Sequence, residues 1–162
     1  MTDSFSSNRP VGPAPKPEDV SFSLEHALRS IVAVRAHIPD DAMTASMLGT
    51  ERAGHGVLIR DDGLVLTIGY LISEADGIWL IDHKGQATSA YVVGYDQETG
   101  FGLVQALQRL DLPSLEFGNS SDLHEGDPVI LAGHGGRKNS VSSHVISIRE
   151  FAGYWEYLID EA

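Results

Sequence analysis

The sequence predicts an all-β fold, either a barrel or a sandwich, and three observations support this class. Short apolar runs alternate with turn residues along most of the chain, glycine-containing turns reverse it between runs, and the runs fall into two groups separated by a linker. A length of 162 residues suits about one domain of ordinary size. The expected strands are 31–34, 56–60, 64–68, 78–81, 90–95 and 101–107, followed by a second group at 128–132, 141–148 and 154–159.

Two segments precede the first strand. Residues 1–20 carry four of the seven prolines among small polar residues, a composition that cannot bury enough apolar surface to become ordered, so we expect a disordered Pro-rich tail. Residues 21–30 predict a short helix, because Ser23 can cap its first turn and apolar side chains follow at helical spacing. Those apolar positions are Leu24, Ala27, Leu28 and Ile31.

The strands divide into two units. Asp61-Asp62-Gly63 is expected to close a hairpin in the first unit, because glycine accepts the positive φ that a tight reversal requires. A linker is expected near residues 111–113, between the two groups of apolar runs. We therefore expect one β unit over residues 31–111 and the first part of another over residues 112–162.

The composition argues against several classes of function. A formal net charge of −12 without a Lys/Arg cluster repels phosphate backbones and anionic lipid, so we expect neither nucleic acid nor a membrane as partner. The chain has no apolar stretch of the ~20 residues that span a bilayer and no signal-peptide pattern at its start. As written, it is expected in the cytoplasm, or in the periplasm if an export signal was removed. Without cysteine or a metal-ligand spacing such as His-Glu-x-x-His, we expect no cofactor and no metal.

Three motifs in the first unit point to a family. GHGVLI at 54–59 leads to TIGYLI at 67–72, and GYDQETGFGLV follows at 94–104. They resemble the Gly-x-Gly strand start, the Thr-Asn-x-His-Val-Val box and the Gly-x-Asp-x-x-Thr-Asp-Leu-Ala-Val-Leu box of the HtrA (Deg) family of trypsin-like serine proteases. By this resemblance, Tyr70 stands where the family has its catalytic histidine, and Gly100 stands where it has its catalytic aspartate.

The resemblance continues through the second unit. It takes in LPSLEFGNSSDL at 112–123, EGDPVILAG at 125–133, SVSSHVIS at 140–147 and YLIDEA at 157–162. It therefore covers roughly residues 31–162 and implies a trypsin-like double β-barrel, with the first barrel complete and the second partial. No Gly-Asn-Ser-Gly-Gly nucleophile loop of the kind the family uses occurs up to Ala162.

The two substituted positions bear on catalysis. Acyl transfer by a serine needs a base that works near neutral pH and a carboxylate that orients it. A phenol, with an ordinary pKa of about 10, is a poor base, and glycine has no side chain. The resemblance thus implies a catalytically inactive HtrA-like domain that binds a peptide or protein or serves in assembly. The alternative is an amino-terminal fragment of an active HtrA-type endopeptidase, with its nucleophile loop beyond Ala162 and His55 as a substitute base.

Two other histidine-containing segments are expected to be structural. His134-Gly135-Gly136 is similar to the oxyanion-hole loop of lipases, but the sequence lacks the Gly-x-Ser-x-Gly elbow that such an enzyme needs. Ser142 and His144 can share one face of a strand, but no third group completes a triad with them.

A partial second barrel also predicts a partner. Its strands would have unpaired edges, and its apolar faces would be uncovered. We therefore expect a second chain or fragment that completes the barrel, or a homo-oligomer with a swapped copy. The apolar positions concerned are Val129, Ile130, Leu131, Val145 and Ile146.

Overall fold

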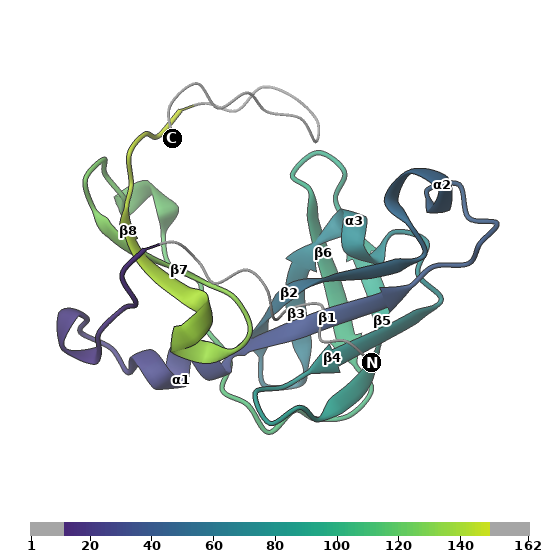
Figure 1. Cartoon of the computed structure of the whole chain (residues 1–162), viewed down its shortest axis with the longest axis horizontal. Helices are drawn as coiled ribbons and strands as arrows, with labels where there is room; N and C mark the ends of the chain where they lie inside the picture. Colours follow the sequence, from purple (N-terminus) through teal and green to yellow (C-terminus); the bar gives the residue numbers. More distant parts are fainter. Residues whose placement is uncertain (1–11, 150–162) are drawn as a thin grey trace.

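The computed structural model describes residues 12–149, and its largest unit is a closed barrel (Figure 1). Six antiparallel strands form the barrel in the order β1-β2-β3-β6-β5-β4, and a separate antiparallel sheet contains β7 and β8. The all-β prediction is therefore confirmed. The strands are β1 (Ile31–His37), β2 (Glu51–Arg60), β3 (Leu64–Ile68), β4 (Gly77–Ile81), β5 (Ala87–Tyr95), β6 (Phe101–Ala106), β7 (Pro128–Ala132) and β8 (Ser140–His144).

The helices in the described part of the chain are short. The expected amino-terminal helix is α1 (Leu24–Arg29), which begins after its predicted cap, where Ser23 Oγ accepts the His26 N–H at 3.4 Å. None of the helices in residues 12–149 is long and apolar enough to cross a membrane. The others are η1 (Pro17–Asp19), α2 (Ala45–Leu48), α3 (Gly69–Ile72), η2 (Ser120–Asp122) and η3 (Gly136–Asn139).

The barrel interior is filled by aliphatic side chains from alternate strand positions. Because successive side chains of a strand point to opposite faces, each strand contributes every second residue to the core. Full burial of one such side chain stabilises the fold by about 1.5–3 kcal/mol. The side chains with no exposed surface include Val32 and Val34 of β1, Leu58 of β2, Val65 of β3 and Val104 of β6.

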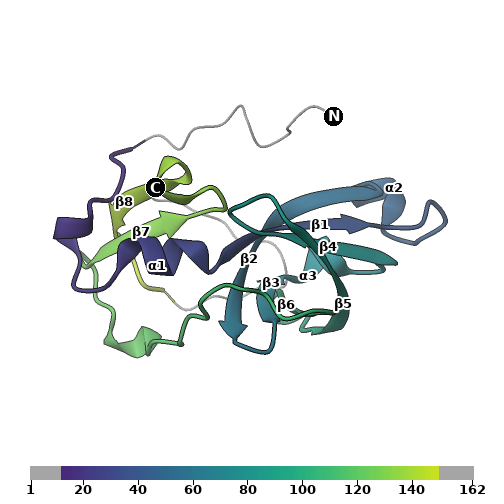
Figure 2. The same cartoon turned by 90° about the horizontal axis from the view of Figure 1, so that it is seen from below.

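A second apolar cluster joins the barrel to the β7–β8 sheet. Leu24 and Leu28 of α1 pack with Ile31 at the start of β1, against Val57 of β2 and Ile130 of β7. Figure 2 shows α1 beside β7, at one side of the barrel. This cluster fixes where the small sheet lies relative to the barrel.

The proline-rich segment is ordered where the structure describes it, from residue 12 onward. The carbonyl of Pro13 accepts the Ser142 N–H of β8 at 2.9 Å, and the carbonyl of Pro15 accepts Arg137 Nε at 3.0 Å. Pro15 is fully buried. Disorder was expected for residues 1–20, whereas in these contacts the proline carbonyls accept hydrogen bonds from β8 and from a side chain of η3. Residues 1–11 lie outside the described part.

Several strand boundaries differ from expectation. β1 ends three residues after its predicted end, at His37, and β5 begins three residues before its predicted start, at Ala87. β2 begins at Glu51, five residues before the predicted start, because β1 pairs with it from Val57 back to Glu51. β8 ends at His144 rather than at residue 148, and the strand expected at 154–159 lies outside the described residues. The predicted turn at residues 61–63 is present, and Gly63 has a φ of 97°.

The end of β1 carries a pH-sensitive pair. His37 Nδ1 lies 2.8 Å from Asp76 Oδ1, and this hydrogen bond is the main cause that raises the pKa of His37 above 6.5. Because the folded pKa is raised, the pair's contribution to stability is fully present below the unfolded pKa and is lost as pH rises through the folded one.

We predict that an NMR titration of the His37 ring gives a pKa above 6.5, and that Asp76→Asn lowers it toward that value. Asp82→Asn is the control, because the Asp82 carboxylate accepts backbone N–H groups of its own turn. An unchanged His37 pKa in Asp76→Asn would contradict the assignment.

Candidate functional site

Tyr70 lies on α3, a single helical turn that directly follows β3. Leu71 and Ile72 turn into the barrel core and are buried, which leaves the Tyr70 side chain 38% exposed at the surface. The turn closes on itself, because the Ser73 N–H reaches the carbonyl of Gly69 at 3.0 Å. Because its two neighbours are buried, the phenol of Tyr70 lies at the surface, at the position that the resemblance aligns with the family's histidine.

Gly100 ends the turn between β5 and β6. Its φ is 77°, and its N–H donates to the carbonyl of Asp96 at 2.9 Å. The Asp96 carboxylate accepts Thr99 Oγ1 at 2.6 Å and the backbone N–H groups of Glu98 and Thr99 at 3.2 Å. The Thr99 hydroxyl is the main cause that lowers the pKa of Asp96. Asp96 is therefore occupied in shaping this turn.

The structure brings these two aligned positions together. The N–H of Gly69, the residue before Tyr70, donates to the carbonyl of Gly100 at 2.8 Å. The neighbouring strand ends are also paired, with Ile68 of β3 opposite Phe101 of β6. The arrangement therefore places a tyrosine beside a glycine, where the resemblance implies a histidine and an aspartate.

His55 lies at the junction between the barrel and the second sheet. Its Nδ1 accepts the backbone N–H of His134 at 3.2 Å, and His134 Nε2 lies 2.9 Å from the carbonyl of Asp82. A side chain at Gly133 would begin 3.1 Å from His55 Nε2, so this glycine allows the ring to fit. Partial burial, and then the charge of His134, lower the pKa of His55. The ring thus contacts the loop after β7.

The other two histidine-containing segments have structural contacts. In the loop at 134–136, Gly135 and Gly136 have φ values of 113° and 71°, and the His134 carbonyl accepts Asn139 Nδ2 at 2.6 Å. Ser142 and His144 lie on β8 opposite Ile130 and Pro128, and they line a cavity of about 730 Å³ under residues 15–22.

Sequence reasoning missed a buried arginine behind α3. Arg52 is only 5% exposed, and its guanidinium donates to the carbonyls of Tyr70 at 2.5 Å, Ser73 at 3.2 Å and Gly49 at 3.2 Å. It also donates to Thr44 Oγ1 at 2.7 Å. Arginine suits this position because its planar fork reaches several acceptors at once.

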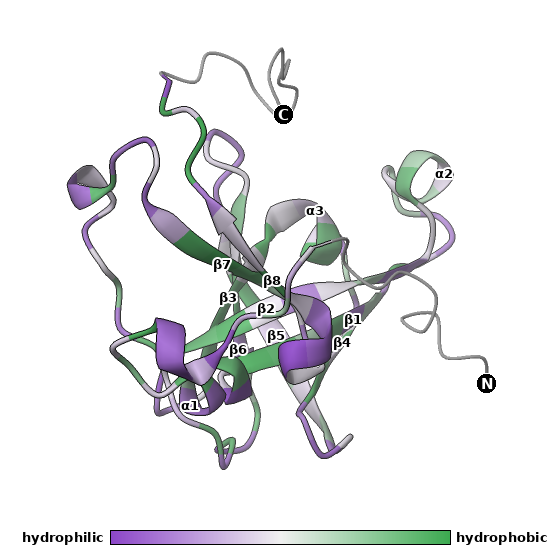
Figure 3. Ribbon diagram, turned by 60° about the vertical axis from the view of Figure 1, so that its left-hand side comes forward, coloured by the Kyte–Doolittle hydropathy of each residue, from purple (hydrophilic) through white to green (hydrophobic). Residues whose placement is uncertain are grey.

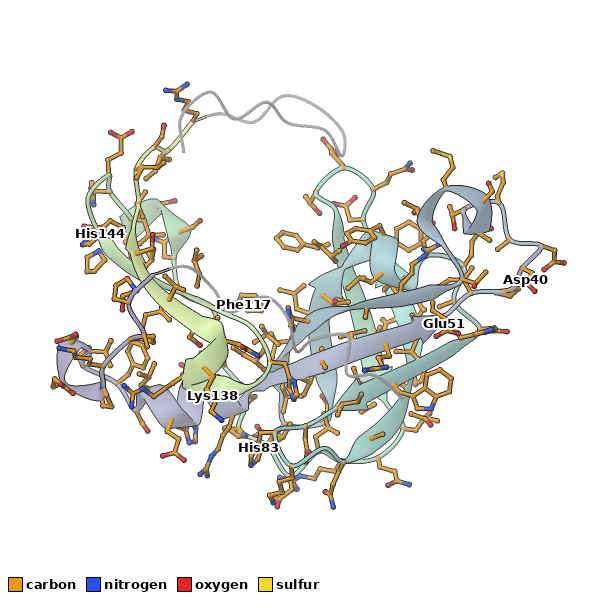
Figure 4. The ribbon with its side chains drawn as sticks, viewed as in Figure 1. Asp40, Glu51, His83, Phe117, Lys138 and His144 are labelled. Carbon is orange, nitrogen blue, oxygen red and sulfur yellow. The ribbon has the colours of Figure 1, made fainter. Side chains whose placement is uncertain are left out.

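An apolar groove adjoins the Gly100 turn. It has a volume of about 430 Å³ and is lined by residues of β2, β3, β5 and β6, with Asp96 as its single carboxylate. Leu66 of β3 lies opposite Leu103 of β6, and the linker brings Phe117 to the groove, where the ring is 73% exposed. In Figure 4, Phe117 lies between the barrel and the β7–β8 sheet.

Within residues 12–149, no group of three or more acidic, histidine or cysteine residues is arranged to hold a metal ion.

The exposed apolar residues of the second sheet include Leu131, at 64%. In Figure 3, the apolar colour marks β7.

Comparison with known proteins gives relatives among serine proteases. A family model described as a trypsin-like peptidase domain matches residues 54–160. A probable periplasmic serine endoprotease of DegP-like type from Chlamydia trachomatis is 35% identical over 97 residues, which is 59% of this chain and 19% of that protein. A DegP-like protein from Rickettsia conorii is 33% identical over 96 residues, or 58% of this chain and 19% of that protein. The chain thus spans about a fifth of the length of these relatives.

Two solved structures share the fold. An HtrA-type protease, AlgW, determined with a tripeptide, matches with a TM-score of 0.61 at 21% identity. The matched region covers 76% of this chain and 38% of the AlgW chain. A serine endoprotease from Yersinia pestis matches with a TM-score of 0.53 at 24% identity. The matched region covers 67% of this chain and 36% of the Yersinia chain.

Proposed function

Because the chain belongs to the trypsin-like peptidase family and resembles its HtrA-type members, we propose that it is a catalytically inactive domain that binds a peptide or protein. One observation carries this proposal. The hydrogen bond from Gly69 to Gly100 joins the two turns that the motifs align with the family's base and orienting carboxylate, and these turns present Tyr70 and Gly100 instead.

The chemical argument concerns proton transfer. A serine nucleophile is activated by an imidazole, and a carboxylate holds that imidazole in the correct tautomer. In well-characterised serine proteases, loss of the aspartate costs on the order of 10⁴ in rate, and loss of the histidine or serine about 10⁶. A domain that lacks both the histidine and the aspartate can accelerate the reaction only by positioning the substrate and by stabilising the oxyanion with backbone N–H groups.

The alternative is a fragment of an active HtrA-type endopeptidase whose nucleophile loop lies beyond Ala162. The short span of this chain relative to its relatives keeps that alternative open. His55 would then replace the missing base. Its Nδ1 already accepts the His134 N–H, so the neutral ring carries its proton on Nε2, beside Gly133, and neither nitrogen is left to accept a proton from a serine. This contact favours a structural role for His55.

We predict that the protein, expressed with whatever sequence accompanies it in the natural gene product, does not hydrolyse unfolded β-casein. It is also expected to remain unlabelled by a fluorophosphonate probe, which marks activated serines. A DegP-like relative, tested in parallel, provides the positive control. Casein hydrolysis that His55→Gln abolishes would overturn the inactive assignment and establish the alternative.

The apolar groove supports a binding role. It continues the same outer face of β2 on which Val57 packs against α1 and β7, so polypeptide that covered it would extend an existing interface.

The strand edges of the β7–β8 sheet can pair with an added strand through main-chain hydrogen bonds. We propose that a second chain or fragment, or a second copy, completes this sheet. Native mass spectrometry is expected to show a particle heavier than one 17.5 kDa chain.

The compartment belongs to the same proposal. The relatives whose names describe them as periplasmic favour the periplasmic alternative for this chain. Fusion of the natural gene product to alkaline phosphatase, which is active only after export, tests it.

A further inference from the structure

A short loop at the far end of the barrel presents apolar side chains to solvent. The chain leaves β1 at His37 and enters β2 at Glu51, and we call residues 39–50 between them the methionine loop. Met43 is 85% exposed and Met47 is 87% exposed, with Leu48 beside them at 46%. In Figure 3, α2 of this loop carries the apolar colour and projects away from the barrel. Exposed methionines gathered on one segment are typical of protein-binding surfaces.

The methionine loop is held in place by side chains from outside it. The Glu74 carboxylate accepts the backbone N–H groups of Met43 at 3.0 Å and Thr44 at 2.8 Å, and it accepts Thr44 Oγ1 at 2.5 Å. The Thr44 hydroxyl is the main cause that lowers the pKa of Glu74. Arg52 donates to Thr44 Oγ1 at 2.7 Å and to the Gly49 carbonyl at 3.2 Å.

The position of Glu74 is itself informative. Its φ of 62° is the only left-handed value found among non-glycine residues of the described chain. Such a conformation is unfavourable for a residue with a side chain and persists where surrounding contacts impose it. Here it accompanies the three hydrogen bonds to the loop. The methionines are therefore displayed on a preformed surface, which reduces the ordering cost of binding.

The charge around the methionine loop is acidic. Asp40 and Asp41 precede α2, and Glu51 follows the loop; Figure 4 labels Asp40 and Glu51 on this part of the molecule. The buried Arg52 guanidinium keeps its positive charge, which helps to lower the pKa of Glu74 after the hydrogen bonds from Thr44 and Met43. The exposed carboxylates of Asp40, Asp41 and Glu51 are additional to that pair. The whole chain carries −12, which disfavours anionic lipid, nucleic acid and a second copy at this surface.

We propose that the methionine loop is a docking surface for a basic polypeptide whose apolar residues contact Met43 and Met47 and whose Lys or Arg residues face Asp40 and Asp41. Methionine side chains adapt to the shape of an apolar partner, and the flanking carboxylates add orientation and a faster encounter. This surface is separate from the groove lined by Phe117 and does not depend on the loss of catalysis.

The probe for this proposal is a fluorescein-labelled amphipathic helical peptide made of leucine and lysine, and binding to the natural gene product is followed by fluorescence anisotropy. A peptide of leucine and glutamate with the same pattern is the charge control. We expect the lysine peptide to bind and the glutamate peptide not to bind. Met43→Ser with Met47→Ser is expected to raise the Kd at least about tenfold, because the apolar contact is removed.

Two variants separate the loop from general acidity. Leu107→Ser with Val93→Ser removes two apolar side chains that are 64% and 52% exposed elsewhere on the barrel, and it is expected to leave the Kd unchanged. Asp40→Asn with Asp41→Asn is expected to raise the Kd and to weaken its dependence on salt. Equal binding by the wild type and the methionine variant would overturn the proposal. So would self-association, measured by sedimentation, that the methionine variant abolishes, because a second copy would then occupy the loop.

Discussion

Replacing Arg52 with methionine is expected to lower the free energy of unfolding by about 3 kcal/mol, a large effect for one residue. Methionine keeps the apolar stem of the side chain but removes every donor of the guanidinium. The carbonyls of Tyr70, Ser73 and Gly49 then lose a charged partner in a site that water reaches poorly. Urea denaturation followed by circular dichroism measures the change.

Arg60→Met provides the matched control, because Arg60 lies on the same strand but at the surface, where it pairs with Asp62. Exposed ion pairs contribute little to stability, so this variant is expected to unfold at nearly the wild-type urea concentration. If both variants lost the same stability, the hydrogen bonds of Arg52 would not be what holds α3 to the loop before β2.

The position of Arg52 explains part of what sequence reasoning could not reach. The strand was expected to start at Gly56, because the residues before it, Glu51 to His55, include two charged residues and a glycine and show no apolar alternation. Once β2 is extended to Glu51, position 52 falls on the same side as Gly54, Gly56 and Leu58. An arginine on the inward side of a strand is the signal that could have identified it.

The predictions that succeeded rest on local patterns. The cap at Ser23, the turn at Gly63 and the alternating apolar positions depend on residues a few positions apart, so the sequence displays them directly. By contrast, His55 accepts a hydrogen bond from His134, which is 79 residues away in the sequence. The carbonyl of Pro15 likewise accepts a hydrogen bond from the side chain of Arg137 in η3. Such contacts depend on how the two sheets meet, and no local pattern records them.

The same limit applies to the candidate site. The motifs align Tyr70 and Gly100 with the family's catalytic histidine and aspartate, and the structure places the two turns in contact through Gly69. The sequence did not indicate that Asp96 and Thr99 build the turn that ends at Gly100, with its φ of 77°. Because an aspartate placed there would adopt an unfavourable backbone conformation, the turn is now suited to glycine.

Replacing Gly56 with valine is expected to destabilise the barrel by about 3 kcal/mol, at the upper end of the usual range for overpacking. A Cβ at this position would lie 2.6 Å from Val65 Cγ1, 3.0 Å from Val34 Cγ2 and 3.2 Å from the Leu66 carbonyl oxygen. Two of these neighbours are fully buried side chains, and the third is backbone, so none can move away easily. The loss is measured as a shift of the urea midpoint.

Gly94→Val separates steric overlap from the general effect of replacing glycine. Gly94 also lies in a barrel strand, but a Cβ there meets no atom within 4 Å. Valine has a higher strand propensity than glycine, so this variant is expected to be neutral or slightly more stable. Equal destabilisation of the two variants would contradict the packing argument. The expected contrast would mean that the Gly-x-Gly motif is retained for close packing inside the barrel, a constraint that persists whether or not the domain cuts peptides.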